Sequence, residues 1–218
     1  MSFEAMFFDL DDTLYPSTSG VWNAIGERMD VFINKSLGFT PAEVRKIRND
    51  LFHEYGTTLR GLKTLYDIDE RAFLDFVHDI PLDRYLQKDN VLIDTISGYR
   101  GRKIIFTNAN QDHAVRVLTI LGIVDFFPEI IDILQTSPYC KPLPEAYRKA
   151  LELSGIRDPE KCVLIDDSPR NLKTAHEMGF FTIQVGTETR CEHADAAVLS
   201  ILDLPDVIPA WQVEPAEE

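Results

Sequence analysis

Apolar runs and polar stretches alternate along much of this chain. The run Ala5-Met6-Phe7-Phe8 ends at Asp9, which predicts a short buried strand with an acid at its carboxyl end. Similar runs predict strands at 103–107, 130–133, 162–165 and 181–185, with a weaker one at 197–199. Helical patterns lie between them at 112–121, 144–153 and 170–178. Strands that alternate with helices favour parallel crossovers, so the pattern predicts an α/β fold with a parallel sheet.

The stretch from Val21 to Asp89 shows a different periodicity. Trp22, Ile25 and Met29 recur at three- and four-residue spacing, and Thr40-Pro41-x-Glu43 is typical of a helix start. If the first strand belongs to the same sheet as the later ones, this helical block is an insertion into the core. We then expect an α/β core of residues 1–17 and 90–204, a helical cap of residues 18–89 and a C-terminal tail of residues 205–218.

Composition adds the broad class of protein. The 218 residues are 44% hydrophobic, which predicts a packed globular core. The formal net charge of −14 disfavours binding to nucleic acid polymers and to anionic membranes. Three cysteines without a C-x-x-C spacing indicate neither a disulfide framework nor a zinc site. With no signal-peptide pattern, we expect a soluble cytoplasmic protein, either a monomer or a homodimer.

Several polar residues come directly after the predicted strands, or close behind them. They are Asp9, Asp11, Thr107, Asn108, Lys141, Asp166 and Asp167. In open parallel sheets, ligands gather beyond the carboxyl ends of the strands, so we expect these side chains to meet. Converging carboxylates repel one another unless a cation lies among them, and oxygen ligands select a hard ion such as Mg²⁺. We therefore expect a Mg²⁺ site formed by Asp9, Asp11, Asp166 and Asp167.

These residue types suit phosphoryl transfer. An aspartate beside a metal ion can attack phosphorus to give an aspartyl-phosphate, which makes Asp9 the expected nucleophile. Asp11 lies two residues on, where we expect an extended backbone that points its side chain to the other side; it can act as general acid and base, while its carbonyl can reach the metal. The hydroxyl of Thr107, the amide of Asn108 and the ammonium of Lys141 can donate to the charged phosphoryl oxygens.

Each feature alone also has a plainer interpretation. An Asp-x-Asp-x-Thr motif can be a solvated turn, and the acid pair at 166–167 can simply cap a helix. A lysine before proline, such as Lys141, is common in solvated loops. The joint occurrence of these residues behind successive strands favours the chemical interpretation.

The motifs resemble the haloacid dehalogenase (HAD) superfamily of phosphohydrolases. Four motifs match, namely Asp9-x-Asp11-x-Thr13, Thr107-Asn108, Lys141 and Asp166-Asp167, and the resemblance covers almost the whole chain. It implies a Rossmann-like core with a C1-type helical cap, Asp9 as nucleophile, Asp11 as acid and base, Thr107 and Lys141 as phosphate binders, and a Mg²⁺ site completed by Asp167 and Asp166, the latter directly or through water.

A closer resemblance is to the pyrimidine 5′-nucleotidase branch. It rests on residues 7–16, on the cap stretch 55–62, and on Thr107-Asn108-Ala109 followed by His113-Ala114. Asp12 departs from this branch, which often carries Asn there. Arg60, in the cap stretch, could meet a second polar group of the substrate, and Tyr55 or Tyr15 could stack on a base; equally, Tyr55 and Leu59 could be plain helix packing.

Four histidines, at 53, 78, 113 and 176, lie in predicted helices without metal-ligand spacing. We expect them to be surface or satisfied core residues, outside the catalytic set.

The leading expectation is a Mg²⁺-dependent phosphomonoester hydrolase that acts on a small nucleoside monophosphate, with pyrimidine bases preferred. A sugar-phosphate phosphatase or a phosphoglucomutase-like enzyme remains open, because the four motifs do not separate these activities. A dehalogenase would not need Asp11 and the acid pair. A phospho-accepting signalling domain has its acid pair early in the chain, and a binding protein without catalysis would not be expected to retain both Asp9 and Asp11.

Overall fold

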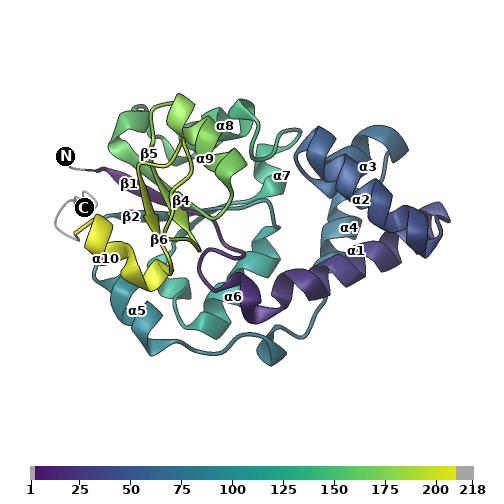
Figure 1. Cartoon of the computed structure of the whole chain (residues 1–218), viewed down its shortest axis with the longest axis horizontal. Helices are drawn as coiled ribbons and strands as arrows, with labels where there is room; N and C mark the ends of the chain where they lie inside the picture. The colour runs from purple at the N-terminus through teal and green to yellow at the C-terminus, as the bar shows by residue number, and fades with distance from the viewer. Residues whose placement is uncertain (1–2, 210–218) are drawn as a thin grey trace.

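The computed structural model describes residues 3–209 and contains a six-stranded parallel sheet. The strand order is β3-β2-β1-β4-β5-β6, and every neighbouring pair is parallel (Figure 1). The strands are β1 (Ala5–Phe8), β2 (Arg102–Phe106), β3 (Glu129–Ile131), β4 (Cys162–Asp166), β5 (Phe181–Val185) and β6 (Ala196–Val198). The predicted α/β fold with a parallel sheet is confirmed.

Helices cover both faces of the sheet (Figure 1). One face carries α5 (Asn90–Ser97), α6 (Gln111–Leu121) and the short α10 (Leu204–Val207), and the other carries α8 (Pro144–Ser154) and α9 (Pro169–Glu177). Side chains alternate along β1: Met6 and Phe8 pack with the first group, whereas Ala5 and Phe7 pack with the second. A strand that is buried on both faces needs an unbroken apolar run, which is the sequence pattern observed.

Five α-helices lie between β1 and β2 in the chain, and we call the first four the cap. They are α1 (Val21–Leu37), α2 (Pro41–Tyr55), α3 (Thr58–Tyr66) and α4 (Glu70–His78), and they lie together beyond the carboxyl ends of the strands (Figure 1). The capping box of Thr40 and Glu43 starts α2 as the sequence predicts. Apolar contacts such as Phe32 against Phe73, with ring centroids 5.0 Å apart, hold the cap helices to each other.

Three details differ from the predicted elements. Strand β3 ends at Ile131, because the side chain of Asp132 caps the short helix α7 (Ile133–Thr136). The backbone at Asp11 turns instead of staying extended, and Asp12 adopts a left-handed φ of 62°. Asp and Asn tolerate this conformation better than most residues, which explains why either residue suits this position.

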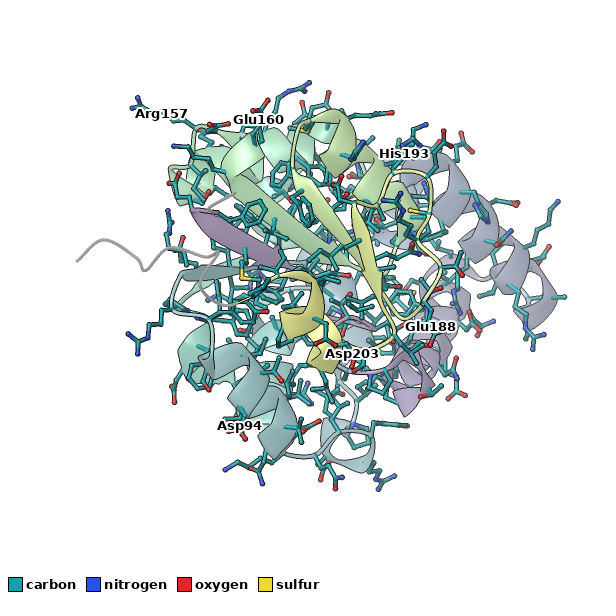
Figure 2. The ribbon with its side chains drawn as sticks, turned by 60° about the vertical axis from the view of Figure 1, so that its left-hand side comes forward. Asp94, Arg157, Glu160, Glu188, His193 and Asp203 are labelled. Atoms are coloured by element: carbon teal, nitrogen blue, oxygen red, sulfur yellow. The ribbon has the colours of Figure 1, made fainter. Side chains whose placement is uncertain are left out.

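The predicted tail, residues 205–218, is described only as far as residue 209, and residues 210–218 lie outside the described range. The described part is packed: Ile208 is fully buried, and its carbonyl accepts a 2.6 Å hydrogen bond from the Tyr99 hydroxyl. Charged residues of the core, among them Asp94, Arg157 and Glu160, point outward (Figure 2). Among the described residues, no helix has the length and apolar character needed to cross a membrane.

Candidate active site

Three carboxylates meet at one edge of the sheet. Asp9 follows β1, Asp166 ends β4, and Asp167 comes next in the chain. Because β1 and β4 are parallel neighbours, with Phe8 paired to Ile165, their carboxyl ends deliver these residues to the same place. One oxygen from each of the three carboxylates lies within 4.8 Å of the others. The sheet topology therefore assembles this part of the predicted site.

Lys141 joins this cluster by another route. It lies in the loop between α7 and α8, well past the end of β3, so its expected position just behind a strand is wrong. Asn108 places it: the Asn108 amide donates to the Lys141 carbonyl and accepts from the Lys141 N–H, both at 3.0 Å. The buried Lys141 ammonium lies 2.9 Å from Asp9 Oδ1 and 2.7 Å from Asp166 Oδ2. Asn108 is thus a support for Lys141, with one amide hydrogen left for a ligand.

Asp166 is fully occupied by protein donors. Its oxygens accept from Lys141, from the Ser168 N–H at 2.9 Å, and from the Asn171 amide at 2.9 and 3.1 Å. Asp167 has one protein donor to its side chain, the Thr13 hydroxyl at 3.4 Å, and its backbone N–H donates to that hydroxyl oxygen at 3.1 Å. Asp9 and Asp167 consequently have more oxygen lone pairs available to a ligand than Asp166 has.

The acids of this cluster repel one another. Burial, together with the charges of Asp166 and Asp167, raises the pKa of Asp9 well above its usual value despite the opposing Lys141. Burial and the charge of Asp166 likewise raise the pKa of Asp167 to about 7. Burial opposes the charged form of Lys141, but Asp166 and Asp9 outweigh it and raise the Lys141 pKa. One ammonium does not balance three carboxylates, and this deficit fits a divalent cation with oxygen ligands.

Asp11 lies beside the cluster with different partners. Its Oδ1 is 2.8 Å from Nε2 of His113 and also accepts from the Tyr15 hydroxyl. Burial alone would raise the pKa of Asp11, but the His113 charge and the hydrogen bonds from His113 and Tyr15 prevail and lower it to about 2. The Asp11 side chain is therefore ionised at neutral pH in the ligand-free protein.

Sequence reasoning missed the surroundings of Asp11. His113 and His78 are both buried, and their rings stack with centroids 4.2 Å apart. The expectation that the four histidines lie outside the catalytic set did not identify this pair. The available signal was the place of His113 in the first turn of the helix that follows Thr107-Asn108, because first-turn residues of such helices face the same sheet edge.

Thr107 has its hydroxyl hydrogen free. The residue is buried, and its Oγ1 accepts a 3.0 Å hydrogen bond from the Ala109 N–H. A hydroxyl that accepts from the backbone can still donate its own hydrogen. Since Thr107 lines the cavity described next, that hydrogen is available to a bound anion.

A cavity of about 740 Å³ lies between the core and the cap. Its core wall includes Asp9, Asp11, Thr107, Asn108, Lys141 and Asp167, and its cap wall includes Trp22, Met29, Arg45, Arg48, Asn49 and Phe52. Tyr55 and Arg60 do not line it. Tyr55 ends α2, and Arg60 lines a separate small pocket with Tyr139 and Ile133. The sequence-based choice of these two residues for the substrate is therefore not supported by the geometry.

The cap stretch 55–62 contributes Gly56, Thr57, Thr58 and Leu59 to the cavity wall, and it also contacts the loop that carries Lys141. Gly56 has a φ of +88°, and a Cβ there would lie 3.1 Å from Pro142 Cδ and 3.4 Å from the Lys141 carbonyl. Only glycine suits a left-handed conformation with so close an approach. This stretch therefore both lines the cavity and packs against the core.

Three arginines bring positive charge to the cavity. Arg48 is tied to the Gly26 carbonyl at 2.8 Å and to Asp30 at 2.6 Å. Arg170, on the core, donates to the Phe52 carbonyl at 3.3 Å and lies over the Phe52 ring. Arg45 is exposed and forms no ion pair with any described residue, so it is the arginine most available to an anionic ligand.

Comparison with known proteins agrees with this geometry. Residues 3–179 match the sequence profile of haloacid dehalogenase-like hydrolases. Phosphate metabolism protein 8 of Saccharomyces cerevisiae is 30% identical over 190 residues, which are 81% of this chain but 59% of that protein. Glyceraldehyde 3-phosphate phosphatase of Methanothermobacter thermautotrophicus is 24% identical over 221 residues, or 94% of this chain and 96% of that protein.

Solved structures share the fold. The magnesium-bound HAD-hydrolase YfnB of Bacillus subtilis aligns with a TM-score of 0.65 at 17% identity, covering 96% of this chain and all of that chain. A HAD phosphatase of Thermococcus onnurineus aligns with a TM-score of 0.63 at 20% identity, covering 96% and 99% of the two chains. The sequence profile spans most of this chain and includes all four motifs. The protein therefore belongs to the haloacid dehalogenase-like hydrolase family.

Proposed function

We propose that this protein is a Mg²⁺-dependent phosphomonoesterase that works through an aspartyl-phosphate on Asp9, with nucleoside 5′-monophosphates as its substrates and pyrimidine bases preferred. The observation that carries the proposal is the cluster of Asp9, Lys141, Asp166 and Asp167 at the base of a cavity between the core and the cap. In this assignment the core comprises residues 1–17 and 90–204, and the cap comprises residues 18–89.

The carboxylate cluster fits Mg²⁺. Asp9 and Asp167 have free lone pairs, the Asp11 carbonyl lies in the same turn, and Asp166 stands behind them, already bound to Lys141. These residues would hold the ion, with Asp166 contributing directly or through water. When bound, Mg²⁺ supplies positive charge that lowers the repulsion between an anionic nucleophile and the phosphate.

The chemistry takes two steps. In the first, a carboxylate oxygen of Asp9 attacks phosphorus, the bond to the leaving oxygen breaks, and the Asp11 carboxylic acid gives that oxygen its proton. In the second, Asp11 takes a proton from water, the water oxygen attacks phosphorus, and the Asp9 carboxylate leaves. A phosphate dianion bound beside Asp11 raises its pKa and so helps it to hold the proton that the first step needs.

Donors around the phosphoryl group come from the same residues that the sequence singles out. The Thr107 hydroxyl, the free amide hydrogen of Asn108 and the Lys141 ammonium surround the position in front of Asp9. Such donors stabilise the charge on the equatorial oxygens in the transition state.

The size and lining of the cavity support a substrate as large as a nucleotide. Its volume of about 740 Å³ lies within the usual range for ligand pockets and exceeds the need of a bare phosphate. On the cap wall, Trp22 and Phe52 are 44% and 40% exposed, which offers apolar surface to a planar base. Asn49 can both donate and accept, as recognition of a base edge requires.

A sugar-phosphate phosphatase is the second candidate. It is favoured by the archaeal relatives named glyceraldehyde 3-phosphate phosphatase, which match along 96% of their length. Such a substrate would fill a smaller part of the cavity.

The test is phosphate release from UMP, CMP, AMP, GMP, glyceraldehyde 3-phosphate and several hexose phosphates, compared as kcat/KM with and without Mg²⁺. We expect UMP and CMP to exceed the other substrates about tenfold or more. EDTA should abolish release, and added Mg²⁺ should restore it. A profile led by glyceraldehyde 3-phosphate would replace the nucleotidase assignment, and release that is unaffected by EDTA would contradict the metal assignment.

A further inference from the structure

The carboxyl group of Asp11 is held by one of its two oxygens. Oδ1 receives both donors, Nε2 of His113 at 2.8 Å and the hydroxyl of Tyr15. Oδ2 has no hydrogen-bond partner among the described residues, and Asp11 lines the cavity. One oxygen is thus an anchor, and the other is free to exchange a proton.

The hydrogen on His113 follows from its partner. A carboxylate accepts and does not donate, so Nε2 of His113 carries the hydrogen in this contact. The other ring nitrogen, Nδ1, is buried and has no hydrogen-bond partner among the described residues. An apolar side chain would fill this space without leaving a buried polar atom unsatisfied, so packing alone does not account for a histidine here.

A second histidine fixes the ring of His113. His78, the last residue of α4, stacks on it with an interplanar angle of 20°. The Asn110 amide donates to Asp75 at 3.2 Å, and its oxygen accepts from the His113 backbone N–H at 3.3 Å. That oxygen therefore faces Nδ1 of His78, 2.8 Å away, which makes Nδ1 the donor. Two stacked imidazole rings, those of His78 and His113, thus connect the cap to Asp11.

We propose that His113 is a positioning residue that holds the Asp11 carboxyl for proton transfer, with His78 of the cap fixing the plane of the His113 ring. This inference rests on the proposed function, because it takes Asp11 to be the acid and base of phosphoryl transfer. His113 does not line the cavity, so it acts through Asp11.

A positioning role has a kinetic signature that a purely structural role lacks. An alkyl phosphate needs its leaving oxygen protonated as the bond breaks, whereas p-nitrophenolate leaves without that help. A misplaced Asp11 should therefore slow formation of the aspartyl-phosphate from alkyl esters and leave its formation from p-nitrophenyl phosphate almost unchanged. General damage to the site would slow both reactions to the same extent.

The experiment compares His113→Phe with His113→Gln. Phenylalanine retains an aromatic face for His78 but has no donor, and glutamine retains an N–H near the position of Nε2. Single-turnover rates are measured with the best nucleotide or sugar phosphate and with p-nitrophenyl phosphate. Val115→Ala, on the exposed face of the same helix, is the matched control, and thermal unfolding of each variant reports the fold.

For His113→Phe we expect about a 100-fold lower rate with the alkyl ester, a KM within threefold, and a retained burst of p-nitrophenolate. His113→Gln should restore at least a third of this loss, with the rates compared on a logarithmic scale. If His113→Phe does not fold, Tyr15→Phe removes the other donor to Oδ1 and should show the same dependence on the leaving group, with a smaller loss.

Two results would overturn the inference. Equal losses on both substrates would mean that His113 serves the fold alone, and a His113→Phe protein as active as the wild type would mean that the contact has no kinetic role. A wild-type protein without activity on any phosphomonoester would instead overturn the proposed function, and the inference with it.

Discussion

The sheet edge and the cap wall of this cavity are built by different rules. At the sheet edge, Asp9 and Asp167 are positioned by strands whose hydrogen-bonded register is fixed to the residue. On the cap wall, Trp22, Arg45 and Phe52 come from helix faces, whose rotation depends on packing with neighbouring helices. The difference teaches that backbone topology sets the positions of the catalytic side chains, whereas helix packing sets the positions of the side chains that would select the substrate.

This comparison also predicts how each region tolerates change. At the sheet edge, Asp9 and Asp166 share the buried Lys141 ammonium, and Asp166 is fully buried, so the loss of the ammonium leaves a buried charge without compensation. The residues of the cap wall are more exposed, and each can be truncated without leaving a buried charge. Large effects on rate should therefore come from the core, and moderate effects on KM from the cap.

The largest effect should come from Lys141→Met, which removes the ammonium between Asp9 and Asp166. We expect kcat/KM to fall about 10³-fold, since one transition-state donor contributes about 10²–10³. Urea unfolding in EDTA should show a loss of about 3–5 kcal/mol, the usual cost of breaking a buried pair. Arg45→Met is the control on the cap wall and should change stability by less than about 0.5 kcal/mol. Comparable losses of stability in both variants would contradict the contrast between the regions.

The second effect concerns His78, where the cap meets the core. Burial, with the charge of His113, lowers its pKa from 6.5 to about 3. Between these values the unfolded chain binds a proton at this site that the folded chain does not bind, so stability falls as the pH falls below 6.5. The slope is up to about 1.4 kcal/mol per pH unit, and it should be missing in His78→Phe.

Urea unfolding at pH 7.5, 6.0 and 5.0 tests this. The wild type should lose about 2 kcal/mol more than His78→Phe between pH 7.5 and 5.0. Parallel curves for the two proteins would show that the histidine is free to protonate in the folded state.

The smallest effect should come from the cap wall itself. Arg45→Ala and Asn49→Ala should each raise KM about tenfold with kcat nearly unchanged, because they remove binding that the ground state and the transition state share. Tyr55→Phe and Arg60→Ala are the matched controls, since neither residue lines the cavity. A larger effect from the control pair would mean that Tyr55 or Arg60 contacts the substrate, as the sequence suggested. It would contradict the assignment of Arg45 and Asn49 to substrate binding.

The sequence predicts the core strands well because each buried strand is a short apolar run. An apolar run that ends at an acid, as at Phe8-Asp9, gives both the strand and the place of the acid. Lys141 is identified as a site residue, but its loop position is missed, because two hydrogen bonds to Asn108 place it and no local pattern reveals them.

The sequence pattern does not predict the contacts of the cap stretch or of the buried histidines. Tyr55 and Arg60 stand in a distinctive stretch, yet the cavity is lined by its residues 56–59, of which Gly56 also packs against the Lys141 loop. His113 and Asp11 are far apart in the chain, and only the folded structure brings them to 2.8 Å. Contacts of this kind depend on helix rotation and side-chain conformation, which the periodicity of one sequence leaves open.

The most direct test of the central claim is to trap the covalent intermediate. The protein is mixed with its best phosphomonoester and Mg²⁺, quenched in acid during the first turnover, digested and examined by mass spectrometry. The prediction is one phosphoryl group on the peptide that contains Asp9, and no phosphoryl group and no turnover in Asp9→Asn. A phosphoryl group on another residue, or turnover by Asp9→Asn, would contradict the assignment of Asp9 as the nucleophile.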